Sequence, residues 1–286
     1  MTEPFVPGAA FALSERVRRV LAPNPGRMTG AGTNSYLIGT PGGGDAVIVD
    51  PGPNVVAHID ALLSALATDR IVGIALTHSH RDHSPAAAPL AVQTGAPRIG
   101  RRARYPEFQD PTLVVDQVAE EGTRIAGTGW TLRAILTPGH ASNHVCWYLE
   151  EEGLLLTGDH ILGGVSPVIL PPDGDMSEYL DSLARLLKLD LSGLLPGHGP
   201  RINEPHAAIR ALIAHRLGRE AKVEAALTRQ SGRSLEELLP EVYADVDPAL
   251  YPWARFSLEA HLIKLEREAR ARRDGTAWYP ADATGA

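Results

Sequence analysis

The chain has 286 residues, of which 44% are hydrophobic, and a formal net charge of −7. This length suits one large domain or a domain with an appendage, and the apolar fraction is enough for a substantial core. The acidic balance gives no electrostatic reason to expect strong general affinity for nucleic acid, and the single cysteine excludes an internal disulfide and indicates a reducing compartment.

The sequence pattern predicts neither a targeting segment nor a membrane segment. Residues 1–8 lack a basic region followed by the apolar stretch of a signal peptide. No apolar run approaches the roughly 18 residues that a membrane helix needs. We therefore expect a cytoplasmic protein without a membrane partner, and the lack of an export signal disfavours a secreted antibiotic-degrading enzyme. The oligomeric state does not follow from the sequence.

The first part of the chain predicts short strands and one helix. Residues 17–21 and 32–38 have strand patterns, and the glycine-rich residues 40–45 predict a hairpin turn before a strand over residues 47–50. Apolar residues then recur at helical spacing over residues 55–66, which predicts an amphipathic helix. This alternation of strands and helices indicates an α/β protein.

The densest group of chemically active side chains lies in residues 77–83, Thr-His-Ser-His-Arg-Asp-His, directly after an apolar strand pattern. Imidazole nitrogens and carboxylate oxygens are ligands that first-row divalent metals favour. His78 and His80 are two residues apart, so in an extended segment they point the same way and suit one ion. Asp82 and His83 follow where the chain turns into a helix, and they suit a second, neighbouring ion. A single histidine would usually be solvated, but this cluster favours a metal site.

Three later segments repeat one construction, in which an apolar strand is followed by a glycine turn and a polar ligand candidate. The candidates are His140, Asp159 and His198. Glycine lets the backbone approach closely and take a positive φ, and α/β proteins place their sites beyond the ends of strands. A single Pro-Gly-His segment is equally well explained as a turn. Together, behind the first cluster, the three segments indicate one shared metal site.

With these motifs, the chain resembles the metallo-β-lactamase-fold hydrolases, and within them the lactamase-β-2-like group, to which glyoxalase II is a more distant relative. The resemblance covers about residues 14–273. It implies an α/β fold in the form of a four-layer αββα sandwich, with metals at one edge of the paired sheets. Position by position, it implies a first zinc ion on His78, His80 and His140, a second on Asp82, His83 and His198, and Asp159 as the bridge between them. Asp82 and Asp159 are the residues that it assigns to catalysis.

The chemistry that follows from this resemblance is hydrolysis by a hydroxide that bridges two zinc ions. Zinc lowers the pKa of bound water from about 15.7 to about 7, and two ions about 3.5–4 Å apart also stabilise the oxyanion of the transition state. Histidine-rich ligation favours zinc, with manganese or iron as alternatives. We expect a small ester, thioester, lactone or amide as the substrate.

Four further residues are candidates for supporting or lining the site: Asp50, Ser142, Asn143 and His160. Asp50 resembles the aspartate that holds a ligand histidine in this family, and a turn-capping role before Pro-Gly is the alternative. Ser142 and Asn143 lie beside His140 in the sequence and either contact substrate or shape the turn. His160 either lines the pocket or packs in the core.

The other histidines are predicted to be solvated or partly buried, namely His58, His144, His206, His215 and His261. Cys146 lies in a strand pattern, where a lone thiol behaves as a small hydrophobe, so we assign it no catalytic role. Some lactamase subclasses use a cysteine as a zinc ligand. Here Asp159 occupies the matching place, which favours a glyoxalase-like pattern.

The segment after Asp159 is predicted to form one wall of the cleft. Residues 163–174 are rich in glycine and proline and precede an amphipathic helix predicted over residues 176–189. Asp175 is the predicted N-cap of that helix.

The pattern becomes almost entirely helical after residue 203, so we place a catalytic domain over residues 1–203 and a second module over residues 204–286. The expected elements are one long helix over 204–229, either continuous or interrupted at Gly218, a helix opening at 234–239 with Ser234 and Glu237 as a capping box, a helix over 258–271, and a strand over 275–279.

Helices followed by a strand suggest a winged-helix-like module, which the lactamase-β-2-like group carries at this place. The module contains 12 Lys and Arg against 13 Asp and Glu, whereas a module that reads nucleic acid is usually basic. The basic cluster Arg267, Arg270, Arg272 and Arg273 is more simply explained as a solvated helix end. We expect the module to act as a lid and packing element.

Three functional classes fit these observations: a small-molecule hydrolase, a single-strand endoribonuclease, which is an activity within the lactamase-β-2-like group, and a non-catalytic metal-binding protein. The complete ligand set disfavours the third class. The acidic balance favours a small-molecule substrate over single-stranded RNA. Salt separates these two classes, because phosphate contacts release counterions and make nuclease activity fall steeply with salt.

Overall fold

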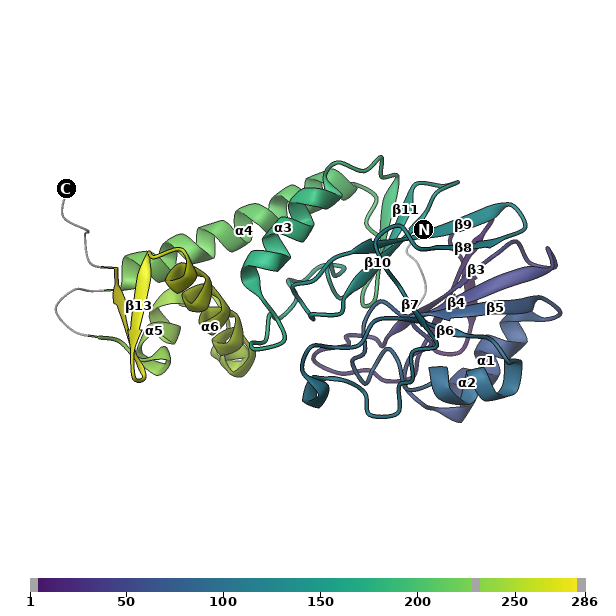
Figure 1. The fold of residues 1–286 in the computed structure, drawn as a ribbon, viewed down its shortest axis with the longest axis horizontal. Coiled ribbons are helices and arrows are strands. Elements are labelled where there is room, and N and C mark those ends of the chain that lie inside the picture. Colours follow the sequence, from purple (N-terminus) through teal and green to yellow (C-terminus); the bar gives the residue numbers. More distant parts are fainter. Residues whose placement is uncertain (1–4, 228–231, 282–286) are drawn as a thin grey trace.

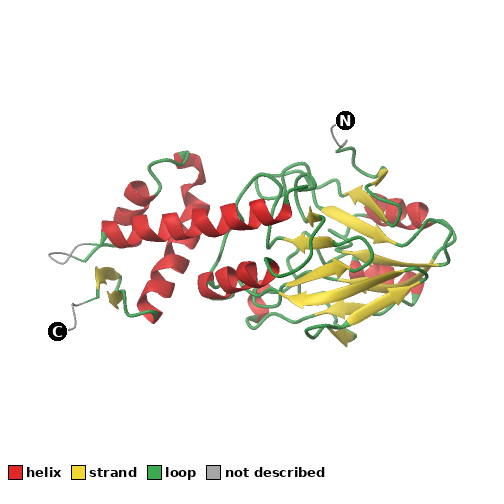
Figure 2. Cartoon of the chain, turned by 90° about the horizontal axis from the view of Figure 1, so that it is seen from above, coloured by secondary structure: helices red, strands yellow, loops and turns green. Residues whose placement is uncertain are grey.

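The computed structural model describes residues 5–227 and 232–281. Two β-sheets pack face to face and carry helices on their outer faces, and a helical module extends from one end (Figure 1). In a second view the module again lies at one end of the molecule and the sheets at the other (Figure 2). The predicted αββα sandwich with a C-terminal helical module is therefore confirmed.

The first sheet has seven strands in sequence order: β1 (Ala10–Ala12), β2 (Val17–Leu21), β3 (Asn34–Ile38), β4 (Asp45–Val49), β5 (Arg70–Ala75), β6 (Arg98–Gly100) and β7 (Gln117–Val118). Neighbours from β1 to β4 are antiparallel, and neighbours from β4 to β7 are parallel. The parallel pairs need crossovers, and α1 (Val56–Leu66) and α2 (Ala87–Thr94) provide the first two. These helices pack on the outer face of the sheet.

The second sheet has five strands in the order β12-β11-β10-β9-β8, namely β8 (Arg124–Gly127), β9 (Trp130–Leu136), β10 (Val145–Leu149), β11 (Leu154–Gly158) and β12 (Gly193–Pro196). Only the β11–β12 pair is parallel. Its crossover contains α3 (Met176–Leu186), whose apolar face covers the outer side of this sheet together with the start of α4 (Pro205–Ala226).

Between the sheets lies a core of buried aliphatic and aromatic side chains contributed by both. Trp130 and Trp147 are its largest members and are fully buried. The indole Nε1 of Trp147 donates a hydrogen bond to the carbonyl of Leu76 (3.1 Å), at the end of β5. This contact fixes the second sheet against the point where residues 77–83 leave the first.

The C-terminal module is built on the second half of α4, with α5 (Leu235–Val242), α6 (Tyr251–Arg267) and a hairpin of β13 (Ala271–Asp274) and β14 (Ala277–Pro280). Two short 3₁₀ turns, Pro106–Phe108 and Pro248–Leu250, complete the described elements. A single long helix thus packs on the sandwich at its start and in the module at its end. Within the described ranges, no helix combines the length and apolarity needed to cross a bilayer.

The capping box at Ser234 and Glu237 and the N-cap at Asp175 are confirmed. Of the two alternatives for the helix predicted from residue 204, the structure has the continuous one, because α4 runs through Gly218, and a glycine inside a helix costs only about 1 kcal/mol relative to alanine. The expected end of this helix at Arg229 lies outside the described residues.

The predicted helix 258–271 is misplaced at both ends. It begins at Tyr251, where Pro252 suits the first turn, and it stops at Arg267 before Ala269, which has a positive φ of 56°. Ala271 instead begins β13, and the strand expected over residues 275–279 is the second arm of a hairpin that turns at Gly275. Strand β1 was not predicted, because its three residues carry too short a pattern.

A buried ion-pair cluster joins α4 to α6. Glu220 has a side chain only 4% exposed, and it lies 2.9 Å from Lys264 Nζ and 2.6 Å from Arg270 Nη1. Burial raises the pKa of Glu220, but hydrogen bonds from His261, Lys264 and Arg270 outweigh burial and lower the pKa to about 2. The cluster therefore stabilises the module only while Glu220 is ionised.

Replacing Glu220 by Gln should lower the free energy of unfolding by about 1–3 kcal/mol at neutral pH, because the buried Lys264 and the half-buried Arg270 lose their shared anion. The folded-state pKa of Glu220 lies below the unfolded value, so this stabilisation is present above about pH 4.3 and is lost as the pH falls toward the folded pKa. Urea denaturation should show the difference between wild type and variant shrinking below about pH 4.

The matched control is Glu241→Gln, because Glu241 has a side chain 56% exposed and pairs with Arg233 at the surface. Its effect should stay below about 1 kcal/mol. A Glu220→Gln difference that stayed constant from neutral to acidic pH would contradict the assigned role.

Candidate metal centre

The seven predicted ligands come from loops that follow four strands. Residues 77–83 follow β5, whereas His140, Asp159 and His198 come after β9, β11 and β12. The glycine turns allow this convergence. A Cβ at Gly158 would lie 2.4 Å from Thr77 Oγ1, and one at Gly197 would lie 2.8 Å from Asp159 Oδ1. Only glycine permits the loops to approach so closely.

The ligand atoms form two groups. In the first, His80 Nδ1 lies 2.9 Å from His78 Nε2 and 3.2 Å from His140 Nε2. In the second, His198 Nε2 lies 3.3 Å from His83 Nε2 and 3.1 Å from Asp82 Oδ2. Each group is small enough for all its ligand atoms to reach one cation.

Asp159 lies between the two groups. Its Oδ1 is 3.3 Å from His83 Nε2 and 3.4 Å from His198 Nε2. Its Oδ2 faces the first group, 3.7 Å from His140 Nε2. The two oxygens of one carboxylate are thus aimed at different groups, which is the arrangement that a bridging ligand requires.

Four of the histidines have one ring nitrogen turned away from the centre (the outer nitrogen) and one turned toward it (the inner nitrogen). Each outer nitrogen is hydrogen-bonded to an oxygen atom. His78 Nδ1 donates to Thr77 Oγ1 (3.0 Å), His83 Nδ1 to Asp50 Oδ2 (3.0 Å), His140 Nδ1 to the carbonyl of Val168 (2.8 Å) and His198 Nδ1 to the carbonyl of Gly32 (3.2 Å). A neutral imidazole with its proton on the outer nitrogen has a lone pair on the inner one. Four inner nitrogens therefore present lone pairs toward the centre.

These residues fit a pair of divalent cations. Lone pairs and carboxylate oxygens that face each other at about 3 Å repel unless a positive charge lies among them. Asp159 Oδ1 is buried and has no hydrogen-bond partner, which is costly for an ionised oxygen unless it binds a cation. The donor set of imidazole and carboxylate is the one that first-row metals prefer.

Asp50 supports both groups from the end of β4. Its carboxylate accepts hydrogen bonds from the backbone N–H (2.7 Å) and hydroxyl (2.6 Å) of Thr77 and from His83. The same Thr77 hydroxyl accepts from His78, so one carboxylate orients a histidine of each group. Asp50 has a φ of 50°, in the left-handed region that disfavours residues with a side chain.

The pKa values of the histidines differ between the two groups of ligands. Burial, together with neighbouring imidazoles, keeps the pKa of His78 well below its usual range and lowers that of His80 to about 3. Burial would also lower the pKa of His198, but the carboxylates of Asp159 and Asp82 raise it to about 9. In the second group a proton therefore takes the place of the cation when no metal is bound.

Ser142 and Asn143 both shape the loops around His140. The Ser142 hydroxyl donates to Asp173 (2.5 Å) and accepts from the backbone N–H of Arg104 (2.8 Å). The Asn143 amide is buried and donates to Ser79 Oγ (2.8 Å) and to the carbonyl of Arg101 (2.9 Å). These bonds use the Ser142 hydroxyl and the Asn143 amide N–H groups within the protein, and the buried Asn143 Oδ1 has no hydrogen-bond partner.

His160 is fully buried, and neither of its ring nitrogens has a hydrogen-bond partner. It packs against Tyr179, with ring centroids 4.7 Å apart, and against His144. Of the two alternatives stated above, this placement matches packing in the core.

His144 was not expected near the site. Its ring stacks on the ligand His78, with centroids 5.2 Å apart and planes at 29°, and its Nδ1 lies 2.9 Å from Thr137 Oγ1. The available signal was its position four residues after His140, immediately before strand β10. His144, His58 and His261 are at most 1% exposed, so the expectation of solvated or partly buried side chains is wrong for these three. Cys146 is buried, and burial raises its pKa to about 12, as an inert thiol requires.

Comparison with known proteins agrees with this architecture. Residues 28–198 match the Metallo-beta-lactamase superfamily, and residues 234–278 match the Beta-lactamase associated winged helix domain. A Beta-lactamase-like protein 2 homolog from Caenorhabditis elegans is 34% identical over 261 residues, which cover 88% of this chain and 83% of the relative.

Solved structures show the same fold. A metallo-beta-lactamase family protein from Thermus thermophilus superposes with a TM-score of 0.78 at 24% identity, covering 94% of this chain and all of that one. A second protein, solved in a di-iron-bound form, has a TM-score of 0.52 at 28% identity and covers 66% of this chain and 96% of its own. The chain therefore belongs to the metallo-β-lactamase superfamily of metal-dependent hydrolases, as a lactamase-β-2-like protein with a C-terminal winged helix domain.

Proposed function

We propose that the protein is a binuclear zinc hydrolase that acts on a small ester, thioester, lactone or amide. The observation that carries this proposal is Asp159, whose two carboxylate oxygens face two separate groups of ligands. When bound, the ions supply Lewis-acid activation of water and stabilisation of the developing oxyanion. A cytoplasmic location remains part of the proposal and rests on the chain's single, buried cysteine.

The chain's own residues have distinct tasks in this proposal. His78, His80 and His140 would hold the first ion, Asp82, His83 and His198 the second, and Asp159 both. Asp50 keeps His83, and through Thr77 also His78, in the tautomer that presents Nε2 to the centre. Asp82 is the most exposed member of the second group, with a side chain 29% exposed, and so lies on the side from which substrate approaches.

Zinc is favoured by the histidine-rich ligands. The relative solved in a di-iron-bound form supports iron as an alternative, and manganese is the third candidate. Metal analysis of the purified protein decides among these three metals.

Single-stranded RNA remains the alternative substrate, but the charges of the module weaken it. Arg270 pairs with Glu224 and Glu268 as well as with Glu220, and Arg267 pairs with Asp175. Cations that are already neutralised release few counterions on binding phosphate. The basic cluster noted in the sequence thus supports the module's own packing better than RNA binding.

The first test is a substrate panel of thioesters, lactones, β-lactams and single-stranded RNA, with metal content measured by mass spectrometry. We expect about two ions per chain and turnover of a small substrate that is lost with a chelator and restored by zinc. Activity should change little with salt. Cleavage of RNA alone, falling steeply with salt, would instead establish the nuclease alternative.

Replacing Asp159 by Ala should lower turnover by more than about 100-fold, because even partners behind the ligands contribute 10–100-fold in metal sites. Metal content should fall from about two ions to about one per chain. Asp60→Ala is the matched control, since Asp60 is exposed on α1. Full activity of Asp159→Ala on a confirmed substrate would refute the bridging role.

Metal loading should release protons from the second group only. At neutral pH the metal-free protein carries a proton on His198, whose pKa is raised to about 9, whereas His80, with its pKa near 3, carries none. The second ion must displace protons, so its affinity should rise as the pH rises toward 9. Calorimetry in buffers of different ionisation enthalpy should detect about one to two protons released with one ion and none with the other. Equal release with both ions would contradict this assignment.

A further inference from the structure

A cavity of about 380 Å³ lies where the module meets the sandwich. Residues 162–168, together with Arg27 and Met28, form its wall on the sandwich side. The module side comes from α4, from the end of α5 and from α6, including Tyr243 and Trp253. Cavities of about 300–1,000 Å³ are typical for small-molecule sites.

The rim of this cavity is apolar and open to solvent. Met28, Val165 and Leu250 are 49%, 64% and 46% exposed, although they are large hydrophobic residues, and all three line the cavity. Exposed apolar side chains that gather in one place mark a binding site more often than scattered ones. Trp253 adds an aromatic wall beside them.

The charge of the lining is positive. Arg27, Arg216 and Arg219 line the cavity, and no carboxylate does within the described part of the chain. His215 also lines it, but burial lowers the pKa of this imidazole, so it adds no charge at neutral pH. Arg219 is paired with Asp245, and Arg216 donates to the carbonyl of Pro167. Arg27 lies over the Trp253 ring and makes no ion pair with any described residue. In a chain with a net charge of −7, such a lining favours an anion.

The cavity shares its sandwich-side wall with the metal centre. The carbonyl of Val168 holds His140 Nδ1, and the N–H of Gly163 donates to the carbonyl of His198 (3.0 Å). Gly32, in the loop of Arg27 and Met28, accepts from His198 Nδ1 (3.2 Å). Val168, which lines the cavity, therefore also holds a ligand of the first metal group, and Gly163 and Gly32, which lie close to lining residues in the chain, bind His198 of the second group.

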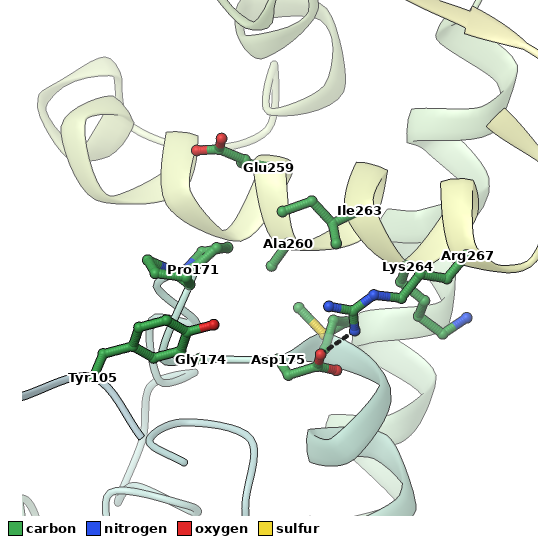
Figure 3. A pocket seen from close by; sticks show the side chains of 11 residues that line it. Tyr105, Pro171, Gly174, Asp175, Glu259, Ala260, Ile263, Lys264 and Arg267 are labelled. Carbon is green, nitrogen blue, oxygen red and sulfur yellow. Dashed lines mark hydrogen bonds and ion pairs between the residues drawn. The ribbon is translucent and has the colours of Figure 1, made fainter. Parts of the chain in front are cut away.

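A second pocket at the same junction lacks these properties (Figure 3). It has a volume of about 250 Å³, and Tyr105 and Asp175 face Ile263 and Arg267 of α6 across it. Its cations are neutralised, because Arg267 pairs with Asp175, and Lys264 with Glu220 and Glu268. It offers no free cation to an anionic ligand, and Glu259 adds a carboxylate to its lining.

We infer that the larger cavity binds the apolar part of an anionic ligand, and that the substrate is an ester or thioester with an alkyl or aromatic acyl group. The substrate assignment rests on the proposed hydrolase function, whereas ligand binding does not. In the reaction, water breaks the acyl C–O or C–S bond, the acyl carbon takes the hydroxyl, and the leaving oxygen or sulfur takes the proton. The acid product then ionises to an apolar carboxylate, which is the ligand class that this lining suits.

Binding can be tested without metal or turnover. Decanoate, decanol and decyltrimethylammonium have the same chain and differ in charge. Trp253 should report their binding by fluorescence, because the other three tryptophans are buried, and Trp253→Phe should remove the signal. We expect the affinity to fall in the order decanoate, decanol, decyltrimethylammonium. Equal binding of the cation and the anion would overturn the inference.

Two variants locate the site. Val165→Asp places a charge on the apolar rim and should weaken decanoate binding by at least about tenfold. Val92→Asp makes the same change at a residue 87% exposed on α2, outside this cavity, and should have no effect. Arg27→Gln should reduce the preference for decanoate over decanol by a few-fold, about 2–5-fold. Unchanged decanoate binding in Val165→Asp would overturn the assignment.

Turnover by the metal-loaded protein tests the role of the cavity and the hydrolase function separately. The selectivity for a decanoyl over an acetyl thioester should fall about tenfold in Val165→Asp and stay unchanged in Val92→Asp. Decanoate binding without hydrolysis of either thioester would support the cavity and refute the hydrolase function. Hydrolysis with unaltered selectivity in Val165→Asp would retain the function and overturn the cavity's role.

Discussion

Seven side chains direct lone pairs and negative charge into one small volume, and the need to hold them there against their mutual repulsion is the constraint on which the rest of the structure depends. A flexible chain would relieve this repulsion by turning the side chains outward. Here the strand ends that supply the ligands belong to two sheets that pack on each other through a hydrophobic core. Hydrophobic burial between the sheets therefore offsets the electrostatic cost of a site prepared for cations.

Asp50 shows how the fold holds the ligands in place. One buried carboxylate accepts three hydrogen bonds and orients a histidine of each metal group, directly for His83 and through Thr77 for His78. Its backbone takes a left-handed conformation that costs of order 1–3 kcal/mol for a residue with a side chain. Such strain persists only where the surroundings determine the geometry, and here the Asp50 N–H donates to the carbonyl of Ala75 in β5 (3.0 Å) and the Gly52 N–H donates to the carbonyl of His83 (2.8 Å). The two metal groups are thus supported as one unit.

The sequence best predicted the features that depend on residues close together in the chain. The ligand candidates could be found because each follows a strand and a sharp turn, and the capping box at Ser234 because its pattern spans four residues. Long-range packing could not be found in this way. His144 stacks on His78 across the fold, and nothing in its neighbours specifies that contact. The start of α6 at Tyr251 was missed although it carries a local signal, Pro252 in the first turn.

The sandwich and the C-terminal module meet different requirements. Ligand geometry needs rigid strand ends, so the metal centre lies entirely within the sandwich. The substrate that we propose would need an apolar surface close to that centre, whereas the loops around His140 are held by polar contacts, such as those of Ser142 and Asn143. The module would supply that surface, and α4 fixes the module's position because one continuous helix packs against α3 at its start and within the module at its end. A hinge at Gly218 would have uncoupled that surface from the metal ligands, and the unbroken helix keeps both walls of the cavity in register.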